Sequence, residues 1–412
     1  MAEFLALKIL SFKMPMQFDE PQRRALEHGH GPALVLAGAG TGKTTVLVER
    51  IGWLLRQRLA QPAEILALTF TDNSAADLRK KVQQHLPNVD CSALKASTFH
   101  AYCFGLLKTH GRAFEVVDGP DLWVFLRRNL SELRLERFIK AANLGEFLGD
   151  LVKFCDRCRE ELVTASVYRN YVRRLHAGEL PLPRVGRTSE ELSTQEILAR
   201  CDELARVYDS VEQLLAGKNL GTFGDMIVRA VELLRSDDVL QRERSGARFI
   251  LIDEFQDCNV AQIELAGLLA GDERNIFAVG DPDQAIYRFR GASSGAFQEF
   301  LRRFPDSERV VLERNHRSTT PILHAAFAGI SRNPAIASEF PPGLDFERRE
   351  LGSARDQAGD ADASPRAVEI VLAADAASEA AEIADRLCEF HDAGSSHWKD
   401  FAVLFRSAGP GF

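Results

Sequence analysis

The segment between residues 32 and 55 constrains the fold of this chain more than any other. A short apolar run, PALVLA (32–37), leads into the glycine-rich AGAGTGKTT, and the helical pattern VLVERIGWLL follows. This strand–loop–helix order is the context in which a phosphate-binding loop is built. Gly38, Gly40 and Gly42 let backbone N–H groups close around phosphate oxygens, where side chains would obstruct them. A GKT triplet in an ordinary turn is the alternative, but the complete context favours the phosphate loop.

Further short apolar runs alternate with helical patterns, which predicts an α/β fold with a parallel sheet. With 412 residues, the chain is long enough for two or three domains. We expect the strands of the sheet to be buried on both faces. They are predicted at 32–37, 64–70, 247–252, 275–279 and 309–312.

An acidic pair follows one of these strands, in the sequence ILIDEFQD. Asp253 and Glu254 would stand at the carboxyl end of the strand, the edge at which ligands bind in parallel sheets. There Asp253 would hold Mg²⁺ through water, and Glu254 would polarise an attacking water. In the loop, Lys43 would pair with the β- and γ-phosphates and Thr44 would ligate Mg²⁺. Acidic pairs more often cap helices or face solvent, but a phosphate loop in the same chain favours the metal-side function.

Residues 106–221 lack the strand pattern and are helical in pattern, which predicts a helical insertion within the α/β domain. The whole chain has a net charge of −8. Residues 121–187 nevertheless hold 13 basic and nine acidic side chains, and such local basic surface suits phosphate contact. An ordinary solvated helix surface explains that excess equally well. Cys155 and Cys158 form a lone CxxC, which we interpret as two thiols one helical turn apart rather than a zinc site.

Seven motifs, taken together, resemble those of the superfamily 1A DNA helicases of the UvrD/Rep/PcrA type in both order and spacing. The resemblance covers roughly residues 17–407, and VGDPDQAIYRFRGA is its most specific part. It implies a RecA-like fold, ATP and Mg²⁺ as cofactors, and single-stranded DNA or DNA with a 3′ overhang as the partner. The family polarity is 3′ to 5′. The motifs are FDEPQRRAL, AGAGTGKTT, LTFTDNSAADLR, STFHAYC, LIDEFQDCN, VGDPDQAIYRFRGA and LERNHRS.

The resemblance assigns nucleotide contacts to residues outside the acidic pair. Gln22 resembles the glutamine that reads the adenine edge, since an amide both donates and accepts. Gln284 resembles the sensor of the γ-phosphate. Arg317 resembles an arginine finger, whose planar charge suits developing phosphoryl charge. His316 stands where the family usually has a tyrosine that stacks on adenine, so weaker or pH-sensitive binding is expected. The motif also assigns nucleotide contacts to the remaining loop residues, Ala37, Ala39, Thr41 and Thr45.

The resemblance also assigns a DNA-contacting surface. Base stacking contributes about 1–3 kcal/mol per base and tolerates any sequence, as a translocating motor requires. Taken singly, each aromatic residue would more often be part of a core. Asp72 and Asn73 replace the family's usual Asn-Lys pair, which we expect to weaken phosphate contact. The residues assigned to DNA are Phe70, Thr71, His100, Tyr287, Phe289 and Arg290.

The domain division that follows has three parts. Residues 1–105 and 222–308 form a first RecA-like ATP-binding domain, 106–221 the helical insertion, and 309–412 an incomplete second RecA-like domain. The last part is expected to contain strands at 367–372 and 401–405 around a helix at about 379–393. We therefore expect slow hydrolysis of MgATP, and no unwinding unless a protein partner completes the motor.

Scattered cysteines favour a reducing cytoplasm, and no run of about 18 apolar residues predicts a membrane span. A binding module for single-stranded DNA or for a partner, without hydrolysis, remains the alternative function. A small-molecule kinase ranks behind it, because a kinase would not need the aromatic DNA motif.

Overall fold

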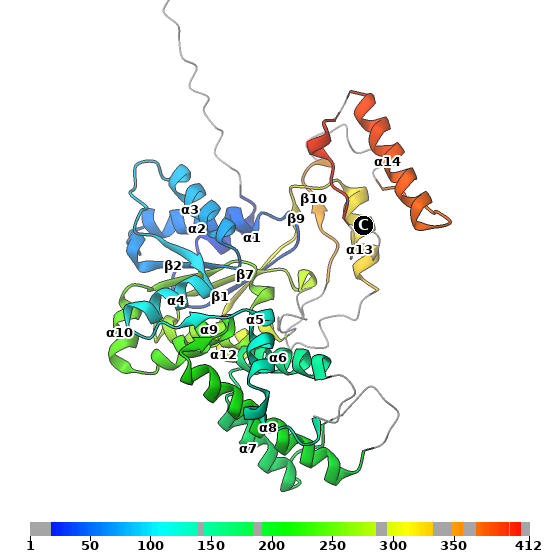
Figure 1. Cartoon of the computed structure of the whole chain (residues 1–412). Coiled ribbons are helices and arrows are strands. Elements are labelled where there is room, and N and C mark those ends of the chain that lie inside the picture. Colours follow the sequence, from blue (N-terminus) through cyan, green and yellow to red (C-terminus); the bar gives the residue numbers. More distant parts are fainter. Residues whose placement is uncertain are drawn as a thin grey trace, which may run out of the picture.

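The computed structural model describes residues 18–138, 144–183, 192–285, 295–332, 348–356, 368–394 and 396–404. Within these ranges, six parallel strands form the central sheet in the order β3-β2-β6-β7-β1-β8 (Figure 1). The α/β prediction with a parallel sheet is therefore confirmed. The strands are β1 (Ala33–Ala37), β2 (Ile65–Thr69), β3 (Lys95–Thr98), β6 (Phe249–Ile252), β7 (Ile276–Gly280) and β8 (Glu308–Leu312).

The strands at the centre of the sheet are buried on both faces because helices cover each side. Alternate residues of β1 belong to different cores: Leu34 and Leu36 pack on one face, Val35 and Ala37 on the other. One face is covered by α1 (Glu20–Leu26), α2 (Lys43–Arg56) and α3 (Asp72–His85). The other is covered by α4 (Phe99–Thr109), α9 (Phe223–Leu233), α10 (Asp237–Ser245), α11 (Val260–Ala270) and α12 (Ala296–Arg303).

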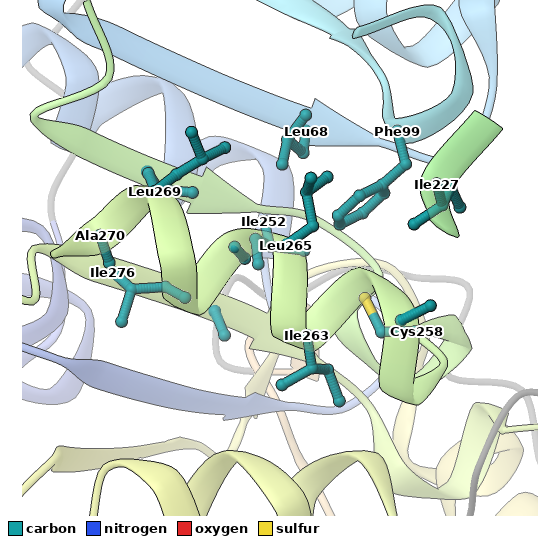
Figure 2. Packing of buried hydrophobic residues seen from close by; sticks show 14 of the residues in the cluster. Leu68, Phe99, Ile227, Ile252, Cys258, Ile263, Leu265, Leu269, Ala270 and Ile276 are labelled. Atoms are coloured by element: carbon teal, nitrogen blue, oxygen red, sulfur yellow. The ribbon is translucent and has the colours of Figure 1, made fainter. Parts of the chain in front are cut away.

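Figure 2 shows how α11 closes the second face. Leu265 and Leu269 of that helix lie against the sheet beside Ile252 of β6, and Phe99 joins them from α4. All four side chains are 1% exposed or less. Burying one such side chain stabilises a fold by roughly 1.5–3 kcal/mol. This core fixes the strand ends at which the candidate site stands.

The helical insertion lies below the sheet in Figure 1 and is helical as predicted, with a small exception. Two short strands, β4 (Glu115–Val116) and β5 (Leu220–Gly221), pair where the chain enters and leaves it. The insertion has cores of its own, built around Leu122, Leu151 and Tyr208 and around Val172. Its helices are α5 (Gly119–Arg128), η2 (Leu130–Leu133), α6 (Leu144–Glu160), α7 (Ala165–His176) and α8 (Thr194–Gly217).

Cys155 and Cys158 lie one turn apart on α6, and both side chains are buried in the core of the insertion. The interpretation of the CxxC as two helical thiols is thus confirmed. Burial raises the pKa of each thiol to about 12, which keeps the thiols protonated and unreactive at neutral pH. Among the residues that the structure describes, no group of His, Cys, Asp or Glu side chains could hold a metal ion by itself.

The chain after the central sheet departs from the prediction in two ways. Residues 309–312, assigned to the second domain, belong to β8, which pairs with β1 in the first sheet. In that strand Val310 is buried and Val311 is 44% exposed, because β8 lies at the edge of the sheet. The boundary expected at 309 therefore lies inside a strand of the central sheet.

The two strands predicted further on, at 367–372 and 401–405, do not form within the residues described there. Their side chains are largely exposed, as at Ile370 (85%) and Leu404 (94%), and a strand needs a neighbour to satisfy its backbone groups. The predicted helix does form, as α14 (Ala376–Asp392), and starts three residues early because Asp375 caps it. This part also contains β9 (Arg314–Asn315), α13 (Thr320–Ile330), β10 (Gly352–Ser353) and η9 (Trp398–Asp400).

No helix among the described residues is long and apolar enough to span a membrane.

Candidate functional site

The phosphate-binding loop stands at the carboxyl end of β1, directly before α2. Gly40 and Gly42 have positive φ angles of 74° and 89°, which favour glycine. Lys43 is the first residue of α2, and the N–H groups in the first turn of a helix have no partner within the helix and can bind an anion. The Thr41 hydroxyl donates to the carbonyl of Gly38 at 2.8 Å and closes the loop from within. The loop has the geometry that its sequence predicts.

The segment after β8 packs directly on this loop. The side-chain amide of Asn315 donates to the Ala39 carbonyl at 2.6 Å, and the His316 N–H donates to the Gly40 carbonyl at 2.8 Å. A Cβ atom at Gly40 would lie 2.6 Å from Asn315 Nδ2 and 2.8 Å from the Cβ of Arg317. The arginine-finger candidate Arg317 is therefore next to the loop, and its side chain is exposed.

Two predicted adenine contacts, Gln22 and His316, lie next to each other and against the phosphate-binding loop. The Gln22 side chain is 4% exposed and donates to the Thr41 carbonyl at 3.2 Å, while its Nε2 lies 3.4 Å from His316 Nε2. Gln22 is held in place by a capping box with Asp19 at the start of α1. A Cβ atom at Gly42 would contact both Gln22 Nε2 and the Cβ of Thr45. The structure thus brings together both residues assigned to the adenine.

The acidic pair lies across from Lys43. The Asp253 N–H extends the ladder by donating to the Leu68 carbonyl of β2 at 3.0 Å, so Asp253 stands at the end of β6. Glu254 follows in the left-handed region, at φ 50°, and its N–H donates to Asp253 Oδ1 at 3.0 Å. Lys43 Nζ lies 3.6 Å from Glu254 Oε2. The loop lysine and the predicted metal-side carboxylates therefore face one another.

Burial makes this cluster of carboxylates costly to ionise. Desolvation and the neighbouring Glu254 raise the pKa of Asp253 to about 6, although Lys43 acts in the opposite direction. The pKa of Asp257, in the same turn, is raised to about 6 by the same two causes. A cation placed between Thr44 and Asp253 would offset this repulsion, and their hydroxyl and carboxylate oxygens are the ligands that Mg²⁺ prefers.

Gln284, the predicted phosphate sensor, ends the short helix η5 (Pro282–Gln284) after β7. Its side-chain amide donates to Asp281 Oδ2 at 2.6 Å. The carboxylate of Asp283, in the same turn, receives two bonds of 2.9 Å from Arg348 Nε. The turn that carries Gln284 is therefore held by two contacts, one from Gln284 to Asp281 and one from Arg348 to Asp283.

A cleft of about 1480 Å³ connects these residues with the helical insertion. The residues that line it include Thr44, Asp253, Glu254 and Gln284 from the predicted nucleotide site. They also include Phe70, Thr71, His100 and Phe223, and the basic residues Lys81, Lys153, Arg157 and Arg159. Residues assigned from sequence to nucleotide and to DNA thus share one continuous wall.

Three of the residues that the resemblance assigns to DNA, namely Phe70, Thr71 and His100, lie within the described part of the chain. Phe70 is half-buried, with its ring 5.9 Å from that of Phe99. Thr71 caps α3 through a 3.1 Å bond from Ser74 N–H. Burial lowers the pKa of His100, which keeps this imidazole neutral at physiological pH. Tyr287, Phe289 and Arg290 lie outside the described residues.

Sequence reasoning missed Phe223. This first residue of α9 is 53% exposed, and its ring lies edge-on to that of His100 with centroids 5.9 Å apart. An exposed phenylalanine at the wall of a cleft is a potential stacking surface. The available signal was its place directly after the Thr222 cap, where the first turn of a helix leaves its side chain uncovered.

Comparison with known proteins gives a consistent picture. The family model of the UvrD/REP helicase N-terminal domain matches residues 18–305. DNA helicase II of Escherichia coli (strain K12) is 33% identical over 326 residues, covering 76% of this chain and 40% of its own length. The ATP-dependent DNA helicase Rep of Salmonella typhimurium is 29% identical over 402 residues, covering 95% of this chain and 52% of its own.

ATP-dependent DNA helicase UvrD1 of Mycobacterium bovis is 32% identical over 328 residues and is covered to 39% of its length. The chain therefore spans about half the length, or less, of these relatives. The matched residues include the loop, the acidic pair and the sensor turn, all of which line or adjoin the cleft. On this match and this geometry together, the chain belongs to the UvrD/REP helicase family.

Proposed function

We propose that the chain forms the nucleotide-binding part of an ATP-driven motor that tracks along single-stranded DNA. The single observation that carries the proposal is one cleft lined both by Thr44 and the acidic pair and by the aromatic residues Phe70, His100 and Phe223. Two of the named relatives are ATP-dependent DNA helicases and the third is DNA helicase II, which supports both ligands. The family resemblance further suggests 3′ to 5′ movement and DNA with a 3′ overhang as substrate.

The nucleotide would bind with its phosphates on the loop at Gly40 and Gly42 and its adenine near Gln22 and His316. Backbone N–H groups at the start of α2 and the ammonium of Lys43 supply positive charge to the phosphates. Gln22 already donates to the Thr41 carbonyl, so the two ends of the nucleotide site share one rigid support. Arg317, exposed beside Gly40, is close enough to the loop to reach bound phosphate.

Hydrolysis would proceed with water attacking the γ-phosphorus while the bond to the β–γ bridging oxygen breaks and ADP leaves. Glu254 accepts the proton that the water loses. Lys43 and Arg317 offset the charge that develops on the phosphoryl oxygens. Thr44 and Asp253 would hold Mg²⁺, and the bound ion would neutralise part of the charge on the phosphates.

Single-stranded DNA would cross the same cleft. Phe70 and Phe223 offer ring surfaces for bases, and the basic residues of the insertion offer contacts for phosphates. Asp72 and Asn73 lie exposed in the first turn of α3, next to Thr71. Because neither residue is positively charged, contact with DNA phosphates would depend on Lys81, Lys153 and Arg157.

The test of this proposal is nucleotide binding by Lys43→Ala. Charge-assisted hydrogen bonds contribute about 1.5–3 kcal/mol, so the variant should bind MgATP about 10- to 150-fold more weakly. Lys95→Ala is the matched control, since Lys95 donates to the Gly246 carbonyl away from the cleft. Equilibrium titration with a fluorescent ATP analogue measures both. Equal affinity in the wild type and Lys43→Ala would contradict the proposed nucleotide site.

The DNA half of the proposal predicts a binding defect in Phe223→Ala. Loss of one stacking surface costs about 1–3 kcal/mol, so affinity for oligo(dT) should fall by about 5- to 150-fold. Stability should change little, because the ring is half exposed. Phe390→Ala on α14, at 55% exposure, removes a similar ring away from the cleft and serves as control. If the two variants bind DNA alike in fluorescence anisotropy, Phe223 has no part in DNA contact.

A further inference from the structure

Gln256 is a buried polar side chain that connects the ends of two strands. It stands in the middle of η4 (Phe255–Asp257), after β6, and is 2% exposed. Its Nε2 donates to Glu254 Oε2 at 2.8 Å, and its Oε1 accepts the N–H of Asp281, after β7, at 2.8 Å. Both functions of the amide are therefore used, each toward a different element of the site.

The connection continues beyond Asp281. The Asp281 carboxylate accepts from the Gln284 side chain at 2.6 Å and from the Asp283 N–H at 3.0 Å. An unbroken chain of hydrogen bonds thus runs from Glu254 through Gln256 and Asp281 to Gln284. The proposed base and the proposed phosphate sensor are joined by groups that are themselves buried.

Gln256 packs closely against the end of β7. A Cβ atom at Gly280 would lie 2.7 Å from Gln256 Oε1 and 3.0 Å from its backbone nitrogen, so glycine at 280 lets the amide approach β7. Glu254 itself needs support, since its backbone is left-handed and its side chain is 43% exposed. The amide donor of Gln256 and the ammonium of Lys43, at 3.6 Å, both contact the same carboxylate oxygen.

We infer that Gln256 is a positioning residue that orients Glu254 for the attacking water and links it to the sensor Gln284. This inference rests on the proposed ATPase function and deepens it. When Gln284 turns from Asp281 toward a γ-phosphate, the Asp281 turn shifts, and Gln256 transmits that shift to the carboxylate of Glu254. A residue that merely filled the core would leave the rate of hydrolysis untouched once the fold was intact.

The experiment compares Gln256→Ala with Gln262→Ala in the whole chain. Gln262 is a second buried glutamine, 4% exposed, which accepts the Asn259 N–H and caps α11 without contacting the chain of bonds. Three quantities are measured: the single-turnover rate of MgATP hydrolysis, the affinity for MgATP, and hydrogen exchange in the peptide that contains Asp283 and Gln284. Thermal melting of each variant reports any general loss of stability.

We expect Gln256→Ala to lower the rate of hydrolysis about tenfold or more. This loss should be smaller than the roughly 10²- to 10⁴-fold loss that follows removal of a general base. MgATP affinity should stay within about twofold of wild type, because no phosphate contact is removed. Hydrogen exchange at Asp283 and Gln284 should accelerate. In a Glu254→Gln background, Gln256→Ala should lower the rate no further, since both act as one unit.

Two results would overturn the inference. One is a wild-type rate together with unchanged exchange in Gln256→Ala. The other is an equal loss of rate in Gln256→Ala and Gln262→Ala, which would reduce the effect to stability. If the wild-type chain binds no MgATP, the proposed function fails separately. Hydrogen exchange then decides the inference alone, and unchanged exchange at Asp283 and Gln284 counts against the link.

Discussion

Replacing Glu254 with glutamine should slow MgATP hydrolysis by about 10²- to 10⁴-fold, the contribution of a general base, and leave MgATP binding in place. An amide cannot accept the proton that the attacking water loses. The substitution keeps the size of the side chain. It also removes one negative charge from beside Asp253, so it should not weaken the binding of MgATP. Single-turnover assays with protein in excess keep slow rates measurable.

Glu264→Gln is the matched control for this prediction. Glu264 lies on α11, away from the cleft, and pairs with Arg303. It should hydrolyse ATP as the wild type does. Equal rates for the wild type and Glu254→Gln would remove Glu254 from the reaction. A wild-type chain that binds MgATP without hydrolysing it would instead favour the alternative, a non-hydrolysing binding module.

The second large effect concerns the buried ion pair between the insertion and the first domain. Arg159 of α6 is 2% exposed and donates from Nε to Asp225 Oδ1 at 2.8 Å. Asp225 also caps α9 through the Thr222 N–H and hydroxyl. Burial alone would lower the pKa of Arg159, but Asp225 more than offsets this and the pKa is raised. The pair fixes α6 against the wall of the cleft next to Phe223.

Arg159→Ala should therefore cost about 3–5 kcal/mol of unfolding free energy, as expected when one partner of a buried pair is removed. Arg157→Ala, two residues earlier, removes an arginine that is half exposed and paired with Glu160 and Glu161. Its cost should be about 1 kcal/mol or less. Urea denaturation followed by circular dichroism measures the two variants side by side. Similar urea midpoints for the two variants would show that the buried ion pair stabilises the fold no more than the exposed one.

The sequence was sufficient for those parts of the fold that depend on local pattern. The central strands β1, β2, β6 and β7 lie within two residues of their predicted bounds, because a run that is buried on both faces is apolar throughout. β3 was not predicted, since Lys95–Thr98 is short and partly polar. The strands expected around 370 and 403 fail for the opposite reason. Their apolar pattern is present, but a strand forms only beside a neighbour.

The same distinction applies to the site. The loop and the acidic pair are contiguous in sequence, so their residue types alone indicate their positions. Gln256 and Asp281 carry no such signal, because their contacts join segments 25 residues apart. The pairing of Gln22 with His316 spans 294 residues and could be inferred only through the family resemblance. Contacts of this kind depend on the order of strands in the sheet.

In an ATP-driven motor of the kind proposed, the nucleotide and DNA sites of the cleft should be energetically coupled. The most direct test is the affinity of Glu254→Gln for oligo(dT), measured by fluorescence anisotropy with and without saturating MgATP. Coupled sites typically differ by 1–3 kcal/mol, so the two affinities should differ by about 5- to 150-fold. The affinity for MgATP should change by the same factor when DNA is added. Identical DNA affinities in both conditions would contradict the account.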